Sequence, residues 1–164
     1  MIIVVFRTPH VLYNPIVIYR YIYYNDSIKN IMKALTIKWI QFAESDLQTA
    51  EYLLDNPKAN QWTFLQVVWH CHQSIEKIFK AIIVNKEKEL LYIHDLPKLL
   101  KLTEIDDLVD KNKDWVFSLN KYYIAPRYPD LPLRQNYPLI NKQKAKDTVK
   151  STRELFICLK EYLK

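Results

Sequence analysis

The chain has 164 residues and 49% of them are hydrophobic, which is enough for one domain with a core and excludes a disordered protein. Its formal net charge is +6, and it contains no glycine at all. The absence of glycine excludes the glycine-rich phosphate loops of the Walker and dinucleotide-binding types. It also argues against hairpin-rich β-sheets, whose turns need positive φ, and favours a helical protein.

The first 31 residues differ in composition from the rest, because they are rich in β-branched residues and tyrosine. Arg7 and Pro9 interrupt the apolar run, so the sequence predicts neither a signal peptide nor a transmembrane helix. One or two strands, a loosely attached arm, and a misassigned start with the functional chain beginning at Met32 are the alternatives. The predicted domains are an N-terminal extension or misassigned start at residues 1–31 and a helical domain at residues 32–164.

Helical periodicity begins near Leu35 and predicts a first helix over residues 37–54 and a second over residues 62–85. The inward positions of the first helix are Ile40, Ala43, Leu47, Ala50 and Leu54. Those of the second are Phe64, Val68, Cys71, Ile75, Ile78 and Ile82.

Three further helices are predicted in the second half of the chain. Asp95 is expected to cap a short helix through Leu100, and another helix runs from Asn112 or Asp114 to Tyr123. Asn141 caps a last helix to about Tyr162, whose inward positions are Ala145, Val149, Leu155, Phe156 and Leu159. The fold class is therefore all-α, an antiparallel bundle of four to five helices with a poorly defined N-terminal extension.

The two cysteines, Cys71 and Cys158, are far apart and form no C-x-x-C motif. This pattern suits a reducing cytoplasm, with both thiols buried as small apolar groups. The localisation that we expect is therefore cytoplasmic.

The basic charge is concentrated near the C-terminus. Residues 121–164 contain ten basic and four acidic residues, so this segment carries the whole net charge of +6. The excess permits an anionic partner, and a solvated lysine-rich helix face is the alternative interpretation.

A proline-rich loop at residues 122–138 carries Arg127, Tyr128 and Asp130 between fixed backbone angles. Arginine binds phosphates and carboxylates in bidentate fashion, so we predict ligand binding by these three residues. The alternative is an internal latch between Arg127 and Asp130, with Tyr128 packed on the bundle.

His70, Gln73, Lys77 and Lys80 are predicted to form one polar face of the second helix, suited to a phosphate or to a partner's carboxylate. The alternative is an exposed helix flank with an ion pair between Glu76 and Lys80.

No metal site and no cofactor are predicted. His70 and His72 diverge by about 200° on a helix, and no H-x-x-x-H pattern exists. We interpret His72 as a partly buried packing residue, and His94 as a residue that faces a neighbouring cleft beside the Asp95 cap.

Several segments, in this order and spacing, resemble the HEPN family (higher eukaryotes and prokaryotes nucleotide-binding domain) over residues 37–162. They are Trp39, Ala43, Asp46-Leu47, Ala50 and Leu53-Leu54; the run Trp69 to Lys77 with Phe79-Lys80-Ala81; His94-Asp95-Leu96 with Leu99-Leu100; and Leu119-Asn120, Tyr122-Tyr123-Ile124 and Arg127 to Asp130.

The resemblance implies a helical bundle that forms homodimers and that often occurs beside a minimal nucleotidyltransferase in a toxin–antitoxin-like pair. Many family members are metal-independent ribonucleases with an Arg-x(4–6)-His motif. No histidine of this chain follows an arginine at that spacing, so the ribonuclease motif is absent and an enzymatic activity is not assigned. A composite site that joins Arg127 with His70 or His94 in space is the remaining catalytic arrangement.

The sequence thus predicts a HEPN-like module that binds a nucleotide, an RNA phosphate or a nucleotidyltransferase partner, without contact to a membrane. The candidate ligand-binding residues are Arg127, Tyr128, Asp130, His70, Gln73, Lys77 and His94. The alternatives are a ribonuclease with a non-standard site and a ligand-free dimeric scaffold.

Overall fold

The computed structural model describes residues 15–124, 127 and 140–164, with side chains from residue 26 onward. No strand occurs among these residues, which confirms the all-α prediction. The helices are α1 (Pro15–Asp55), α2 (Gln61–Asn85), α3 (Leu96–Thr103), α4 (Asp106–Val109), α5 (Lys113–Leu119) and α7 (Lys142–Tyr162), with 3-10 turns η1 (Asp110–Asn112) and η2 (Asn120–Tyr123).

The chain divides into two compact units, residues 1–31 and 32–164. In the first unit, residues 15–31 are helical and belong to α1, so the strands considered for this region do not form there. Pro15 is the first residue of α1, where its missing N–H is tolerated, and neither glycine nor proline interrupts residues 16–55. The functional division into an extension and a helical domain stays a prediction.

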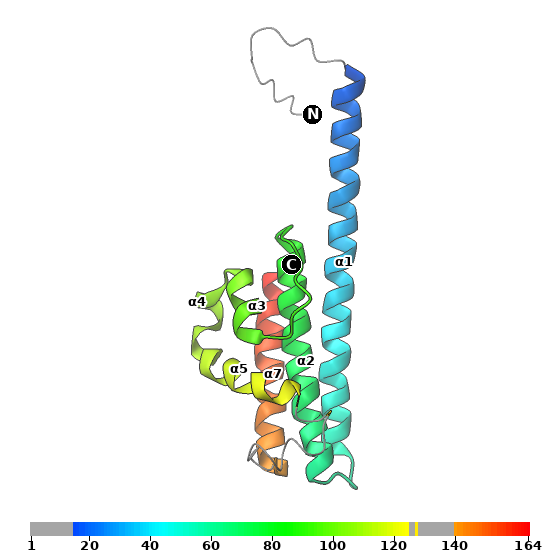
Figure 1. Ribbon diagram of the computed structural model, residues 1–164. Coiled ribbons are helices and arrows are strands. Elements are labelled where there is room, and N and C mark those ends of the chain that lie inside the picture. The colour runs from blue at the N-terminus through cyan, green and yellow to red at the C-terminus, as the bar shows by residue number, and fades with distance from the viewer. Residues whose placement is uncertain (1–14, 125–126, 128–139) are drawn as a thin grey trace. The chain divides into compact units, whose positions relative to one another are not determined.

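Helix α2 is the centre of the second unit. It contacts α7, α3, α5 and η2, and the part of α1 from residue 32 onward runs along it (Figure 1). All six predicted inward positions of α2 are buried, and so are the five of α7. In α1, Ala43, Leu47, Ala50 and Leu54 are buried, while Ile40 is partly buried against the same core. The periodicity thus identified the core of the bundle.

The helix starts follow from polar caps that satisfy free backbone N–H groups. Asn60 accepts hydrogen bonds from the N–H groups of Trp62 and Thr63 at the start of α2. Asp95 accepts a hydrogen bond from the Lys98 N–H at 3.0 Å, and Asn141 accepts one from the Lys144 N–H at 2.8 Å. Both caps are confirmed as predicted.

Three boundaries differ from the sequence-based expectation. Helix α1 begins well before residue 37, and α3 continues to Thr103. The helix predicted to reach Tyr123 is α5, which ends at Leu119. The next four residues, Asn120 to Tyr123, form the 3-10 turn η2. The four-residue α4 was not predicted, because an element of one turn has no measurable period.

The end of α2 shows how a chain without glycine closes a helix. Glu87 has φ 56°, its N–H donates to the Val84 carbonyl at 2.9 Å, and Lys88 N–H donates to the Ile83 carbonyl at 3.1 Å. This is the hydrogen-bond pattern of a Schellman motif, in which glycine is the favoured left-handed residue.

Glu87→Gly is therefore expected to raise the free energy of unfolding by about 0.5–1 kcal/mol, because it removes the Cβ from a left-handed position. Urea unfolding at pH 7 measures the change. Glu89→Gly, an exposed position outside any helix and without positive φ, is the matched control and should be neutral or slightly destabilising. Equal effects of the two substitutions would contradict the strain at Glu87.

Cys71 is buried as expected, whereas Cys158 is exposed, so the prediction that both thiols are buried is wrong for Cys158. Cys158 lies on the outer side of α7, beyond the buried stripe that faces α2. Burial raises the pKa of the Cys71 thiol to about 12, against a smaller lowering by its hydrogen bond to Thr152.

One thiol per chain, that of Cys158, is expected to react with Ellman's reagent at pH 8 in the native protein, because only the thiolate attacks the reagent. Two thiols should react in concentrated urea. Cys158→Ser should abolish the native reaction, and rapid native labelling that persists in this variant would contradict the burial of Cys71.

Candidate functional site

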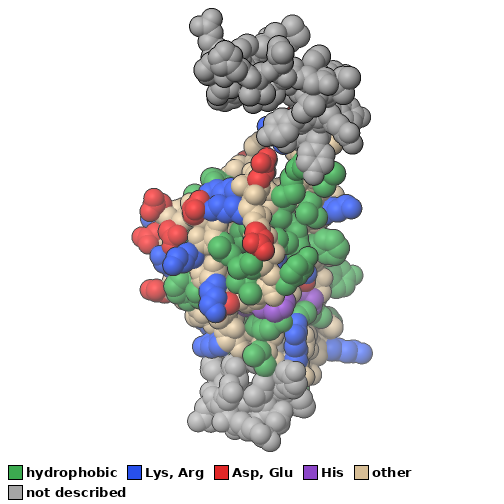
Figure 2. Space-filling view, turned by 45° about the horizontal axis from the view of Figure 1, so that its top comes forward, with side chains coloured by type: hydrophobic (Ala, Val, Ile, Leu, Met, Phe, Trp, Pro, Cys, Tyr) green, Lys and Arg blue, Asp and Glu red, His purple; other side chains and the backbone are tan. Residues whose placement is uncertain are grey.

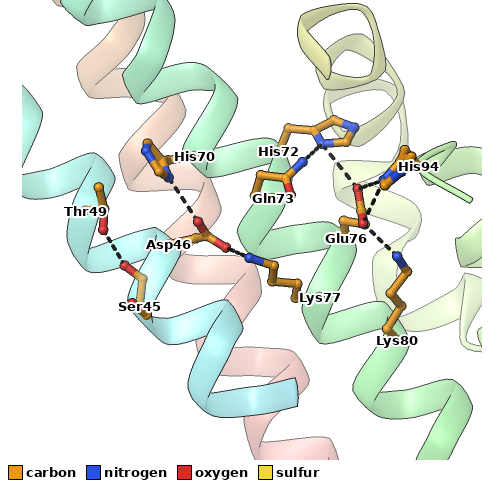
Figure 3. A network of polar contacts seen from close by, with 10 residues as sticks. All are labelled: Ser45, Asp46, Thr49, His70, His72, Gln73, Glu76, Lys77, Lys80 and His94. Atoms are coloured by element: carbon orange, nitrogen blue, oxygen red, sulfur yellow. Dashed lines mark hydrogen bonds and ion pairs between the residues drawn. The ribbon is translucent and has the colours of Figure 1, made fainter. Parts of the chain in front are cut away.

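The polar residues of α2 form two clusters on different sides of the helix (Figure 3). His70 and Lys77 contact Asp46 of α1, whereas Lys80 contacts Glu76 on the side that faces His94. Gln73 and Lys80 are buried. The prediction that His70, Gln73, Lys77 and Lys80 share one ligand-binding face is therefore wrong for Gln73 and Lys80. The alternative of an exposed flank is wrong for the same two residues. The Glu76–Lys80 pair forms as proposed, but inside the protein.

The Asp46 cluster consists of Asp46, His70 and Lys77. His70 Nδ1 lies 2.9 Å from Asp46 Oδ1, and Lys77 donates to Asp46 Oδ2. Because a carboxylate only accepts, Nδ1 of His70 carries the proton of this bond. The His70 and Lys77 side chains keep about a fifth of their surface exposed, at 20% and 22%. Parts of the His70 and Lys77 side chains therefore remain accessible to solvent.

The Glu76 cluster consists of Glu76, His72, Lys80 and His94. Both carboxylate oxygens of Glu76 lie 3.1 Å from His94 Nδ1, and Lys80 Nζ donates to Oε1 at 2.7 Å. Glu76 is only 2% exposed and Lys80 only 4%. An ion pair this deep requires full hydrogen bonding, because each charge has lost its water.

His72 is completely buried, rather than partly buried as predicted. Its Nδ1 lies 3.8 Å from Glu76 Oε2 and 3.4 Å from Gln73 Nε2. No hydrogen bond with accepted geometry reaches its Nε2 from the described residues. The Asn120 side chain nevertheless acts on the ring and raises its pKa. Burial outweighs these contacts and lowers the pKa of His72 to about 4.

The Tyr123 ring joins the candidate histidine and the candidate arginine. His94 stacks on Tyr123 with ring centroids 4.3 Å apart and an interplanar angle of 16°. The Arg127 guanidinium lies 4.4 Å from the Tyr123 centroid and donates to the Tyr123 hydroxyl at 3.1 Å. Arg127 and His94 are thus held against one ring, although 33 positions separate them in the sequence.

Trp69 connects this group with the Asp46 cluster. Its ring lies 5.7 Å from the Arg127 guanidinium and 4.8 Å from the His70 ring. His94 and Arg127 therefore both contact the Tyr123 ring, and His70 and Arg127 both lie beside the Trp69 ring. These are the two histidines that the sequence proposed as partners of Arg127. The composite arrangement of arginine and histidine is formed by packing and not by a short motif.

The exposed histidine has a defined tautomer. Because Glu76 only accepts, its bonds require the proton on Nδ1 of His94, so the neutral ring carries its lone pair on Nε2. The side chain of His94 is 45% exposed, which gives Nε2 access to solvent. A histidine oriented by a carboxylate is suited to proton transfer or to hydrogen bonding with a phosphate.

Tyr128 and Asp130 lie outside the described residues, so the latch between Arg127 and Asp130 stays a prediction. The sequence reasoning did not select Trp69, Tyr123, Asp46 or Glu76 as site residues. The available signal was the i, i+4 spacing between Tyr123 and Arg127, and the presence of Glu76 as the one carboxylate among the histidines and lysines of residues 69–80.

No group of three or more histidine, cysteine, aspartate or glutamate side chains suited to a metal ion occurs in the part of the chain that the structure describes. Across the same residues, no helix combines the length and the apolar character needed to cross a membrane.

Comparison with known proteins gives one match. The family model for the HEPN domain matches residues 36–162, which is most of the chain and includes both clusters and Arg127. No curated protein and no solved structure matches the chain.

Proposed function

Because the chain belongs to the HEPN domain family, whose role is linked to nucleotides and RNA, we propose that it binds the phosphate of a nucleotide or of RNA at Arg127 and His94. The observation that supports this most is the placement of both side chains against the Tyr123 ring. Tyr128 and Asp130 complete the proposed set from the loop, while His70, Gln73 and Lys77 support it from α2.

Arg127 suits this role because its side chain is oriented without a carboxylate among the described residues. The two aromatic rings and the Tyr123 hydroxyl fix the plane of the guanidinium. Its remaining N–H groups keep the fork geometry that matches two phosphate oxygens. An arginine that is already positioned loses less entropy on binding than a free one.

The surroundings of Arg127 favour an anion with an aromatic base. In Figure 2 histidine side chains reach the surface between hydrophobic side chains, with Lys or Arg side chains close by. His94 adds a hydrogen-bonding nitrogen, and the rings of Trp69 and Tyr123 add apolar surface of the kind on which nucleobases stack.

A metal-independent ribonuclease with a non-standard site is the second candidate. It is favoured by the bond between His94 and the buried Glu76, which orients the ring so that, in its neutral form, Nε2 carries the lone pair that a general base uses. Arg127 would stabilise the charge that develops on the phosphate.

A protein partner is the remaining element of the proposal. We expect a homodimer in the cytoplasm and a nucleotidyltransferase partner in a toxin–antitoxin-like pair. Exposed apolar side chains of α1, among them Ile37, Phe42 and Tyr52, support a protein contact. Sedimentation equilibrium tests the dimer, and relief of expression toxicity by the product of a neighbouring gene tests the pair.

Arg127→Ala is expected to weaken binding of labelled RNA and of ATP about ten- to a hundredfold, because it removes a charge-assisted bidentate bond. Arg127→Lys should recover only part of the loss, since it keeps the charge but not the fork. Fluorescence anisotropy and calorimetry measure the affinities. Lys111→Ala, at an exposed position without an ion pair among the described residues, is the control and should bind like the wild type.

The same samples separate the alternatives. RNA cleavage that is lost in both Arg127→Ala and His94→Ala would establish the ribonuclease. Unchanged binding in Arg127→Ala would refute the proposed site. Binding of neither ligand by an intact dimer would leave the ligand-free scaffold.

A further inference from the structure

The turn η2 meets the segment that leads into α3 at two points. Oδ1 of Asn120 accepts a hydrogen bond from the Leu96 N–H at 2.9 Å, across 24 positions of sequence. The Tyr123 ring stacks on His94, with ring centroids 4.3 Å apart. The second contact belongs to the candidate site, and the first joins the other ends of the same two short segments.

The geometry of the two segments relates these contacts to each other. Asn120 and Tyr123 are the first and last residues of η2, and side chains three positions apart on a 3-10 helix project to the same side, about 6 Å apart along its axis. His94 and Leu96 flank Asp95, whose backbone is extended, so about 6.6 Å separates them. Because the two spacings match, the bond from Leu96 to Asn120 brings Tyr123 to His94.

The start of α3 depends on Asn120 for a complete set of hydrogen bonds. The first N–H groups of a helix have no partner within the helix. Asp95 accepts from the Lys98 N–H, and Pro97 has no N–H. The Leu96 N–H remains, on a residue that is 0% exposed, and it donates to Asn120. Because a buried N–H without a partner is unfavourable, this bond ties η2 to α3.

Apolar packing defines the position of η2 relative to α3 less sharply. Both elements pack against α2 and α5, and residues such as Leu99 of α3 and Tyr122 of η2 are buried. Apolar contacts have no preferred direction, whereas a hydrogen bond requires a narrow range of distance and angle. Glu76 holds the His94 ring through Nδ1, which leaves the position of Tyr123 to be set from η2.

We propose that Asn120 is a positioning residue of the candidate site. Its hydrogen bond to Leu96 holds η2 where Tyr123 stacks on His94. The Tyr123 ring and hydroxyl in turn orient Arg127. This role rests on the proposed phosphate binding at Arg127 and His94, and it belongs to a residue that acts through Tyr123 and not on the ligand. A helix cap without this role would contribute to stability only.

The first test records the histidine ring signals of the full chain by NMR without any ligand. The chain has four histidines, so the signals of His94 can be assigned from the spectrum of His94→Gln. A ring proton above an aromatic face resonates upfield, and in Asn120→Ala the His94 signals should lose most of this shift. Tyr123→Leu, which removes the aromatic ring itself, supplies the value for the unstacked state.

Two further variants at position 120 separate the acceptor oxygen from the side chain as a whole. Asn120→Asp keeps an acceptor for the Leu96 N–H and should retain most of the upfield shift of His94. Asn120→Gln is longer by one methylene and should displace the His94 signals in the same direction as Asn120→Ala. Since it preserves the amide, it tests the role even where Asn120→Ala does not fold.

The second test measures the affinity for ATP by calorimetry. Asn120→Ala should bind ATP about tenfold more weakly than the wild type, because an arginine and a histidine that are not held in place lose more entropy on binding. Asn141→Ala is the matched control, since it removes an asparagine cap that accepts from the Lys144 N–H at 2.8 Å at the start of α7. It should keep the His94 signals and bind ATP within about twofold of the wild type.

Asp95→Ala is the control within α3. It removes the other cap of this helix start, the bond from the Lys98 N–H at 3.0 Å, and leaves the bond between Leu96 and Asn120 in place. The upfield shift of His94 should therefore persist. Urea unfolding of each variant measures the loss of stability, so that all variants are compared under conditions in which they are folded.

The outcomes separate this role from the proposed function. Unchanged His94 signals in Asn120→Ala or Asn120→Gln, an equal change in Asp95→Ala, or a lost shift in Asn120→Asp would each overturn the positioning role. So would wild-type affinity for ATP in Asn120→Ala while Arg127→Ala weakens it. Stacking that depends on Asn120, in a protein that binds no ATP or binds it independently of Arg127, would keep the positioning of Tyr123 and refute the proposed site.

Discussion

Glu76→Ala is expected to lower the free energy of unfolding by about 3–5 kcal/mol, which is the usual loss when one partner of a buried ion pair is removed. Lys80 would keep its charge at 4% exposure without the carboxylate that accepts from it at 2.7 Å. His94 would lose both of its bonds to Glu76, and with them the orientation of its ring. Urea unfolding at pH 7 measures the change.

Two comparisons make the Glu76 result specific. Glu51→Ala breaks the pair with Arg153, whose side chain is 55% exposed, and should lower the free energy of unfolding by no more than about 1 kcal/mol. In a Glu76→Leu/Lys80→Met double variant no charge is left buried, so most of the loss should be recovered. A single-variant effect as small as that of Glu51→Ala would mean that water reaches Lys80.

The fold was predictable wherever burial is periodic. In α2 and α7 one stripe is apolar and the opposite face is polar, so the sequence shows both the helix and its inward side. The first part of α1 has no such stripe, and Ile28, Ile31 and Leu35 are exposed, so periodicity could not reveal a helix there. Continuity of the backbone without a breaker determines it instead.

The sequence identified several residues of the candidate site, but it did not show how the fold divides them into two clusters. His70 and Lys77 are seven positions apart and differ by about 20° around the helix, as do Gln73 and Lys80. The two pairs lie about 60° from each other. That angle is enough to point His70 and Lys77 at Asp46 of α1, while Lys80 reaches Glu76 and Gln73 reaches His72. Which neighbour occupies each direction depends on tertiary packing, which helical spacing does not contain.

The contact between Arg127 and His94 is a further case of this limit. The Arg-x(4–6)-His pattern would place both groups on one helix, where spacing alone predicts proximity. Here the histidine precedes α3, the arginine follows η2, and Tyr123 brings them together. A search for local motifs therefore rejects an arrangement that the fold produces from distant segments.

The free energy of unfolding is expected to decrease by about 2 kcal/mol between pH 7.5 and pH 5 because of His72. Burial lowers the pKa of this ring from 6.5 to about 4 in the folded protein. Above pH 6.5 neither state binds the proton, whereas between pH 6.5 and 4 the unfolded chain binds it and the folded protein does not. The neutral His72 ring therefore costs no stability above pH 6.5. Between pH 6.5 and about pH 4, the free energy of unfolding falls by about 1.4 kcal/mol for each pH unit.

Urea unfolding of the wild type and of His72→Gln at pH 7.5, 6.5, 5.5 and 5.0 tests this effect. Carboxylates remote from residue 72 are common to both proteins, so their contribution cancels in the difference between the two free energies of unfolding. The stability of the wild type relative to the variant should therefore fall by about 2 kcal/mol from pH 7.5 to pH 5.0. Within the described residues, burial is the largest cause of the lowered pKa. Glu76, the Asn120 side chain and the His94 backbone oppose the shift by favouring the charged ring, whereas the charge of the His94 ring adds to it. A constant difference would mean that the folded protein admits the proton, which a ring of α2 with 0% exposure beside the Tyr123 ring of η2 should not allow.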